Sequence, residues 1–258
     1  MHDENSQHPV ERLAEMLVEF GDYPEGVEPV PACITGLAFF PGGAGLWGAA
    51  IGRPLPPMPV GKVMIIGHNF DSKDNYQKSL AKGTENVNGP TWRTLLALLS
   101  ACDIAPEDCF FTNAYMGLKA DTDKATGKNT STGTFPGAGN HAFSYHCHAF
   151  LLKQIRAQQP RVVLTLGEKV LPMLAPLAPE LTAAWRGASH LSDVDKSAGA
   201  LVYPVHFPGV PHPSAVVALT HLANRGPNVK RRRYRELEGP DAERALIHEA
   251  LVASGLVD

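Results

Sequence analysis

The stretch Lys62-Val-Met-Ile-Ile-Gly-His-Asn-Phe-Asp71 decides which fold this chain is expected to adopt. Residues 63–66 form a short, unbroken apolar run, which is typical of a strand buried on both faces of a parallel sheet. A glycine ends the run, and polar side chains follow directly. Because ligands bind just past the carboxyl ends of strands in an open parallel sheet, His68, Asn69 and Asp71 are predicted to line a site. The alternative for this stretch alone is an ordinary polar loop between a strand and a helix.

Further apolar runs that are typical of strands follow at 109–113, 161–166 and 200–206. Helical spacing of apolar residues is found at 9–20, 91–101, 141–158 and 241–253. Strands that alternate with helices in this way predict an α/β fold, a three-layer α/β/α sandwich with a central four-stranded parallel sheet. A long polar loop is expected at 71–90, and a short helix is expected after residue 214.

The chain has 258 residues, of which 44% are hydrophobic, so it is long and apolar enough to bury a sizeable core. It contains no internal repeat and no linker, which predicts a single domain over 1–258. Within that domain, 1–60 is expected to form an N-terminal helix and an irregular arm. Residues 225–258 are expected to form a C-terminal basic run and helix.

The net formal charge of −3 does not indicate a polyanionic partner for the whole molecule, so any nucleic-acid surface has to be a local patch. No apolar run approaches the roughly 18 residues of a membrane span, and the N-terminus does not resemble a signal peptide. The protein is therefore expected to be cytoplasmic, with no membrane association.

The four cysteines do not form a C-x-x-C pair, which favours scattered reduced thiols over a zinc or iron–sulfur site. His141, His146, Cys147 and His148 are denser in the sequence. However, His146 and His148 cannot share one face of the helix predicted there. We expect no metal and no cofactor.

The end of each of the four predicted strands carries polar residues or glycine. These segments are Gly67-His-Asn-Phe-Asp71, Thr112-Asn113, Gly167-Glu-Lys169 and His212-Pro-Ser214. The fold rule places all four at one edge of the sheet, so one cleft is expected to collect them.

In this order and spacing, the four segments resemble the motifs of the uracil-DNA glycosylase superfamily. That superfamily has a Gly-x-(Asp/Asn)-Pro motif after its first strand and an Asn after its second. It also has a Leu-Gly turn after the third strand and His-Pro-Ser after the fourth. The matches here are Gly67-His68-Asn69, Thr112-Asn113, Leu166-Gly167 and His212-Pro213-Ser214. The resemblance covers roughly residues 63–217.

The resemblance implies a catalytic role for Asn69 and His212. A neutral imidazole at His212 could donate a hydrogen bond to the base oxygen as negative charge builds on the departing base. An amide does not take a proton at neutral pH, so Asn69 would hold the attacking water by hydrogen bonds instead of acting as its base. Asn113 has both donor and acceptor atoms and could read the Watson–Crick edge of a pyrimidine.

Several base-binding positions depart from the superfamily pattern. Phe70 stands where the first motif usually has Pro, and Asp71 stands where it has Tyr or Gly. His68 adds a polar group beside them, and a carboxylate at Asp71 could favour a base that bears a hydrogen-bond donor. The Phe that stacks on the base in relatives has no clear counterpart, and Tyr76, Trp92 or Phe70 could replace it.

A basic run at 230–235 follows the His-Pro-Ser segment in an otherwise acidic chain. Such a concentration of charge predicts contact with DNA phosphates, and the alternative is a solvated helix face. The residues expected to bind DNA are Ser214, Lys230, Arg231, Arg232 and Arg233.

The sequence therefore predicts a monomeric, monofunctional DNA glycosylase that hydrolyses the N-glycosidic bond of a flipped-out uracil or modified pyrimidine. Two alternatives stay open. One is a glycosylase for a bulky modified base, as in defence against foreign DNA. The other is a lesion-binding protein with little catalysis. A hydrolase of free nucleosides or nucleotides is a weaker third alternative.

Overall fold

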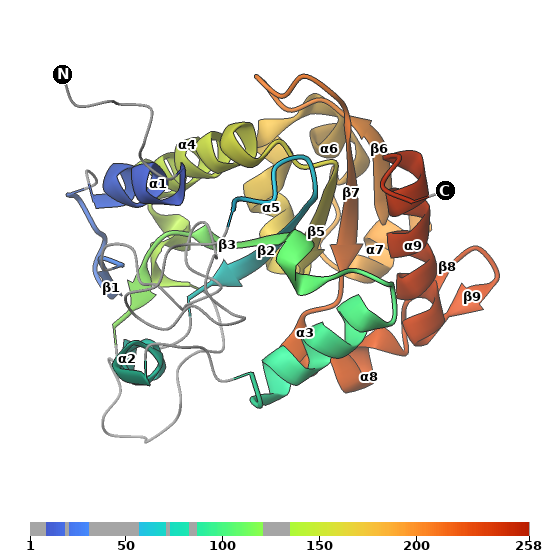
Figure 1. Cartoon of the computed structure of the whole chain (residues 1–258), viewed down its shortest axis with the longest axis horizontal. Coiled ribbons are helices and arrows are strands. Elements are labelled where there is room, and N and C mark those ends of the chain that lie inside the picture. The colour runs from blue at the N-terminus through green and yellow to red at the C-terminus, as the bar shows by residue number, and fades with distance from the viewer. Residues whose placement is uncertain are drawn as a thin grey trace. The chain divides into compact units, whose positions relative to one another are not determined.

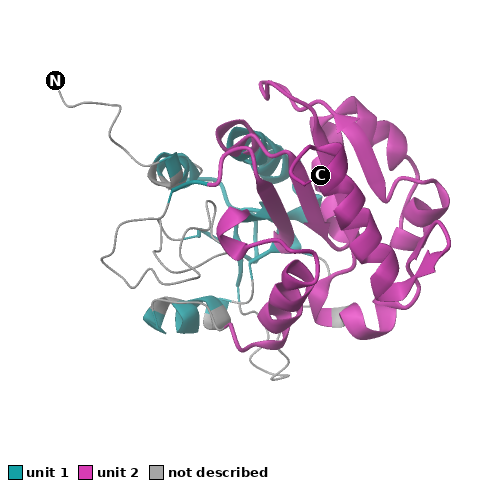
Figure 2. Cartoon of the chain, turned by 45° about the vertical axis from the view of Figure 1, so that its right-hand side comes forward, with its two compact units in different colours: residues 1–58, 69–85, 111–154 teal, residues 59–68, 86–110, 155–258 magenta. Residues whose placement is uncertain are grey.

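The structure is a computed structural model of the chain, and it describes residues 9–18, 21–30, 57–70, 73–82, 87–120 and 135–257 (Figure 1). The chain falls into two compact units (Figure 2). Unit 1 comprises Met1–Met58, Asn69–Glu85 and Phe111–Gln154, and unit 2 comprises Pro59–His68, Asn86–Phe110 and Ile155–Asp258. The prediction of a single domain stays a prediction.

A five-stranded sheet runs through the fold in the order β3-β2-β5-β7-β6. Its strands are β2 (Val63–Asn69), β3 (Cys109–Tyr115), β5 (Val162–Leu166), β6 (Leu201–Val205) and β7 (Ser214–Leu219). β5 is parallel to both β2 and β7, whereas β6 is antiparallel to β7. The α/β class is confirmed, and helices flank the sheet. The sheet has five strands where four were predicted, and it is not purely parallel.

The last parallel strand lies later in the chain than predicted. Residues 200–206 were expected to be that strand, but β6 is an antiparallel edge strand that is partly exposed and contains Pro204. A proline cannot donate to the hydrogen-bond ladder, which suits an edge position. Residues Ser214–Leu219, expected to begin a short helix, are instead the fully buried strand β7. The helix expected there is therefore wrong.

Unit 2 surrounds its part of the sheet with helices. These are α3 (Pro90–Ser100), α5 (Leu171–Leu174), α6 (Pro179–Ala184), α7 (Leu191–Lys196), α8 (Arg225–Val229) and α9 (Gly239–Ala253). The helix α9 packs on β5, β6 and β7 through buried residues that include Ala242, Leu246 and Ile247. The helices α3 and α9 confirm the helical patterns predicted for these segments.

Unit 1 contains α1 (Pro9–Val18), α2 (Lys73–Lys82), the short pair β1 (Val27–Glu28) and β4 (Leu118–Lys119), and most of α4 (His141–Gln158). The rings of Tyr115, Phe135 and Phe143 stack on one another there. α1 and α4 confirm predicted helices, but α2 lies inside the expected polar loop. The sequence 73–82 is strongly polar and has few apolar residues, so it favours a polar loop over a helix.

In the parts of the chain that the structure describes, no helix is both long and apolar enough to span a membrane.

Candidate active site

A histidine, His221, lies just past the carboxyl end of β7 in unit 2. The strand ends at Leu219, whose carbonyl accepts a hydrogen bond of 2.8 Å from the Gly167 N–H just past β5. Thr220 is still buried, and His221 is the first residue past the strand with an exposed side chain. A 3-10 turn (Leu222–Asn224) and α8 follow directly, so His221 sits on a short loop held at both ends by regular structure.

The imidazole of His221 is held in one tautomer by its own loop. Its Nδ1 accepts a hydrogen bond of 3.3 Å from the Ala223 N–H, so the proton of the neutral ring is on Nε2. Desolvation, and then the nearby positive charge of Lys169, lower the pKa of His221 from its ordinary value of 6.5. At neutral pH the ring is therefore neutral and can donate a hydrogen bond through Nε2.

Gly167 is required where β5 turns beside this histidine. Its backbone has a φ of 99° and a ψ of 157°, a region that is essentially restricted to glycine. A Cβ atom at this position would lie 3.0 Å from the His221 Cβ. The glycine therefore allows the two strand ends to approach closely. The predicted turn after strand β5 is confirmed.

A buried ionic network lies beneath the loop, and it includes one of the arginines expected to bind DNA. Arg232 is 2% exposed, and its guanidinium pairs with Asp195 and Glu243. A side chain that is enclosed in this way cannot contact a DNA phosphate, so the DNA-binding prediction for Arg232 is wrong. It is a charged residue of the core, held by two carboxylates.

The rest of the basic run is largely neutralised at the surface. Arg233 pairs with Glu238, and Arg235 pairs with Glu249. Lys230 and Arg231 are exposed, and neither forms an ion pair with any residue that the structure describes. The run is therefore not one continuous phosphate-binding surface, because its members face different surroundings.

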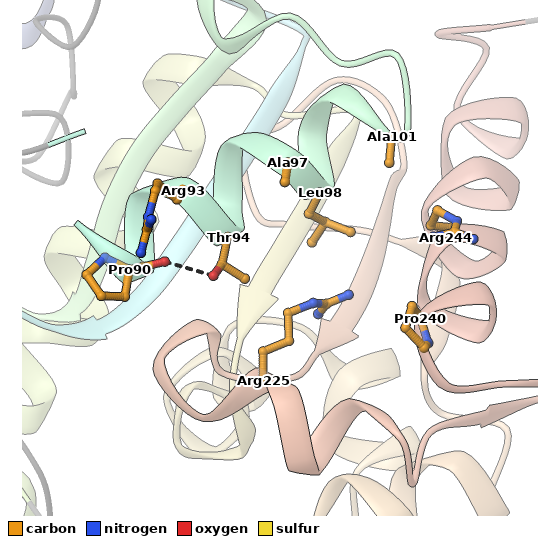
Figure 3. A pocket seen from close by; sticks show the side chains of 9 residues that line it. All are labelled: Pro90, Arg93, Thr94, Ala97, Leu98, Ala101, Arg225, Pro240 and Arg244. Carbon is orange, nitrogen blue, oxygen red and sulfur yellow. Dashed lines mark hydrogen bonds between the residues drawn. The ribbon is translucent and has the colours of Figure 1, made fainter. Parts of the chain in front are cut away.

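An open pocket of about 510 Å³ lies among α3, α8 and α9 (Figure 3). It is lined by Pro90, Arg93, Thr94, Ala97, Leu98, Ala101, Arg225, Pro240 and Arg244. Arg225 pairs with the buried Glu243, and Arg244 pairs with Asp241 on its own helix. Arg93 is exposed and has no ion pair with the described residues. The pocket therefore brings three guanidinium groups to one surface of unit 2.

The His-Pro-Ser segment lies at the other end of β7 from His221. Ser214 is the first residue of β7, is fully buried and donates a hydrogen bond of 2.6 Å to the Pro160 carbonyl. His212 follows β6 as expected, but β6 is antiparallel to β7, so His212 lies at the amino end of β7. The prediction that His212 lies at the carboxyl ends of the parallel strands is therefore wrong. The DNA-binding prediction for Ser214 is also wrong, since its hydroxyl is enclosed in the core.

The remaining predicted residues are distributed between the two units. His68 and Asn69 are the last two residues of β2 and are half-buried, and the Asn69 Nδ2 donates to the Phe70 carbonyl. In unit 1, Phe70 is buried and meets Tyr76 edge to face, with ring centroids 5.8 Å apart. Asp71 lies outside the described residues.

Asn113 is buried inside β3, which continues to Tyr115 instead of ending at Asn113 as expected. Trp92, one of the possible stacking residues, is buried on α3 in unit 2. The prediction that one cleft collects all four strand ends stays a prediction.

The sequence reasoning missed His221. The literal match to His-Pro-Ser drew attention to residues 212–214, and the run Ala-Val-Val-Ala-Leu that follows was not assigned to a strand. That run is unbroken and apolar like residues 63–66, and Thr220-His221 follows it directly. Applying to this run the same rule that was used for β2 would have found the histidine.

Among the described residues there is no group of three or more His, Cys, Asp or Glu side chains that could hold a metal ion. His146 and His148 both lie on α4, where burial lowers the pKa of each. The described residues therefore do not provide the ligands of a metal site.

A family model described as "Uracil DNA glycosylase superfamily" matches residues 59–238. The match extends from the start of β2 to β9 (Leu237–Glu238), and it includes the loop that carries His221. No curated protein matches the chain.

Proposed function

The chain belongs to the uracil-DNA glycosylase superfamily, and from this membership we propose that it hydrolyses the N-glycosidic bond of a flipped-out uracil or modified pyrimidine in DNA. The observation that carries the proposal is the neutral imidazole of His221 at the carboxyl end of β7. The superfamily's catalytic histidine follows its fourth strand, and β7 is the last parallel strand here.

His221 would act on the leaving group. When the glycosidic bond breaks, the base takes the bonding electrons and negative charge builds on its oxygen. An N–H that a fixed tautomer already supplies can donate to that oxygen without a change of tautomer, which stabilises the transition state. The proton stays on the imidazole, because a neutral ring is a hydrogen-bond donor here and not an acid.

Asn69 would hold the water that attacks the sugar. Its Nδ2 is engaged by the Phe70 carbonyl, which leaves the Oδ1 lone pairs as the acceptor for a water proton. Asn113, buried in β3, would read the Watson–Crick edge of the base through its amide. Both roles come from the superfamily's motifs and are tested separately from that of His221.

The motif around His221 departs from the superfamily's His-Pro-Ser. Leu222 and Ala223 stand where the motif has Pro and Ser. Ala223 supplies a backbone N–H to the His221 Nδ1, so the loop itself provides the tautomer control. We propose that the exposed cations Arg93, Lys230 and Arg231, which form no ion pair with the described residues, contact DNA phosphates.

Oligonucleotides that each carry one uracil or one 5-substituted pyrimidine, single-stranded and paired, test this function. We expect base release that leaves an alkali-labile site, with the strand intact until alkali is added. Strand cleavage without alkali would contradict a monofunctional mechanism. Tight binding without release of any base would identify a lesion-binding protein instead.

A further inference from the structure

We propose that Glu243 is a positioning residue that holds the His221 loop in its catalytic geometry, an inference that rests on the proposed function. Glu243 lies on α9, is fully buried and is remote in sequence from the loop. It does not touch the imidazole. Its carboxylate instead contacts the chain on both sides of His221.

The first contact fixes the chain immediately before His221. The Thr220 N–H comes one residue after the last residue of β7, and the Glu243 Oε1 accepts it at 2.7 Å. The carboxylate thus takes the place of a strand partner and prolongs the ordered backbone to the residue next to the histidine. Loss of this acceptor would take the Glu243 oxygen away from a buried N–H, and an unsatisfied buried N–H is costly.

The second contact fixes the chain after His221. The Glu243 Oε2 accepts from the Arg225 guanidinium, at the beginning of α8. One rigid carboxylate therefore bonds to both ends of the segment 220–225. Inside that segment, the Ala223 N–H must stay directed at the His221 Nδ1 for the tautomer to hold.

The carboxylate is itself held in place by Arg232. The Arg232 Nη1 donates to the Glu243 Oε1 at 3.0 Å and to the Ala218 carbonyl at 2.8 Å. Its Nε and Nη2 donate to the two oxygens of Asp195 at 3.1 and 2.9 Å. Two carboxylates and two guanidinium groups are thereby balanced in charge, as buried ions must be. The Glu243 carboxylate itself is held by direct hydrogen bonds from the Arg232 and Arg225 guanidinium groups, which fix it more tightly than one hydrogen bond could.

Asp195 provides a matched control within the same network. Its side chain is 5% exposed, it pairs with the same Arg232, and its removal also takes one negative charge from the network. It contacts Arg232 and the Arg233 N–H but no atom of residues 220–225 among the contacts that the described residues form. Glu243→Gln and Asp195→Asn therefore disturb the same charge balance, and only Glu243→Gln disturbs the loop.

We expect Glu243→Gln to lower kcat by about 10- to 100-fold with KM nearly unchanged, the scale of a displaced catalytic group. Asp195→Asn should reduce thermal stability comparably and leave kcat close to that of the parent. The ring nitrogens of His221 in ¹⁵N-histidine-labelled protein give a direct reading of the tautomer. The chain has 11 histidines, so the His221 signals are assigned by their loss in His221→Ala. Glu243→Gln should shift these signals, and Asp195→Asn should not.

Equal losses of kcat in the two variants, with unchanged His221 signals, would overturn the inference and leave Glu243 as a stabilising residue only. If the parent releases no base from any substrate, the proposed function fails, yet the nitrogen signals still decide whether Glu243 positions the ring. Should Glu243→Gln not fold, Arg225→Met cuts only the outer contact. Unchanged His221 signals in Arg225→Met would then overturn the inference.

Discussion

Two histidines lie at opposite ends of β7, and they distinguish the assignment made from the sequence motif from the one made from the structure. His212 lies before the amino end of β7, where its Nδ1 is 3.2 Å from the Pro213 carbonyl, and His221 lies past the carboxyl end. We expect His221→Ala to lower turnover by about 10² to 10³, the usual effect of removing one donor to a developing anion. His212→Ala, the matched control, should retain the activity of the parent.

Single-turnover rates on a uracil-containing oligonucleotide measure both variants. A loss in His212→Ala with full activity in His221→Ala would reverse the assignment and restore the role expected from the literal His-Pro-Ser motif.

The lowered pKa of His221 makes a second prediction about the pH dependence of activity. The neutral ring is the active form, because protonation of Nδ1 removes the acceptor for the Ala223 N–H. Activity should therefore be full above the His221 pKa and fall as the pH drops through it. Since the pKa lies below 6.5, the acid limb should have its midpoint below 6.5. Asn69 does not titrate, so it adds no limb of its own.

The same shift has a consequence for stability with a definite sign. A group whose pKa is lower in the folded state binds fewer protons there than in the unfolded chain, so stability increases with pH through that window. His221 thus contributes stability above pH 6.5 that is lost as the pH falls through its folded pKa.

A pH–rate profile of kcat, together with an NMR titration of His221, checks that this residue causes the loss of activity at low pH. An acid limb that persists in the residual activity of His221→Ala would contradict it.

Gly167 gives a third prediction at the residue scale. An Ala there meets both a glycine-only backbone conformation and the His221 side chain, whose Cβ and Cδ2 would be 3.0 and 3.3 Å away. We expect Gly167→Ala to lower the free energy of unfolding by about 1–3 kcal/mol and to lower kcat as well. Gly61 has a φ of 74° and nothing within 4 Å of an added Cβ, so Gly61→Ala shows the backbone effect alone.

Urea unfolding and steady-state kinetics of the two alanine variants separate the causes. If both variants lose stability and neither loses kcat, then contact with His221 has no catalytic importance.

At the scale of the elements, the basic run 230–235 contains cations that are paired with acidic side chains and cations that, among the described residues, are free to bind DNA phosphates. We expect the double variant Lys230→Ala/Arg231→Ala to bind all DNA sequences more weakly. The slope of log affinity against log salt should flatten by roughly one unit per lost contact. The control Arg233→Ala/Arg235→Ala removes cations that are already paired with Glu238 and Glu249, so its slope should change less.

Fluorescence anisotropy over a series of salt concentrations measures these slopes. Equal slopes for the parent and both double variants would assign the whole run to the solvated surface, and would leave Arg93 in the pocket of unit 2 as the cation to test next.

The elements with a strong period could be predicted from the sequence, and those without one could not. The helices α1 and α3 and the strands β2 and β5 follow from apolar patterns in the sequence. The helix α2 is polar nearly throughout, and β6 and β7 are both apolar in sequence although only β7 is central. What distinguishes these two strands is their neighbours in the sheet, which come from distant segments of the chain.

The same limit applies to the candidate site. The residues after β2 could be predicted because the strand and its polar end are adjacent in sequence. Arg232 could not be assigned to the core, because its two carboxylate partners lie on α7 and α9. The sequence shows where cationic residues cluster, but the acidic residues that pair with them can be identified only from the fold.

At the scale of the whole molecule, the net charge of −3 leaves DNA binding to local features. Several of its arginines are held by acidic side chains, so the positive charge that can reach a phosphate is smaller than the sequence indicates. The affinity of the protein for undamaged DNA should then be modest, and its dependence on salt should be shallow, because the salt slope scales with the number of phosphates that the protein neutralises.

The interleaving of the two units along the chain also limits how the protein can be dissected. Neither unit is one continuous segment, so no single cut yields one of them whole. The longest continuous piece of unit 2, from residue 155 to the end, contains β5, β6 and β7 but lacks β2. Expressed as a truncation, it would present the unpaired edge of β5 to solvent, and an open edge of that kind recruits other chains. Fragment libraries of this protein should therefore yield aggregates where full-length preparations stay dispersed.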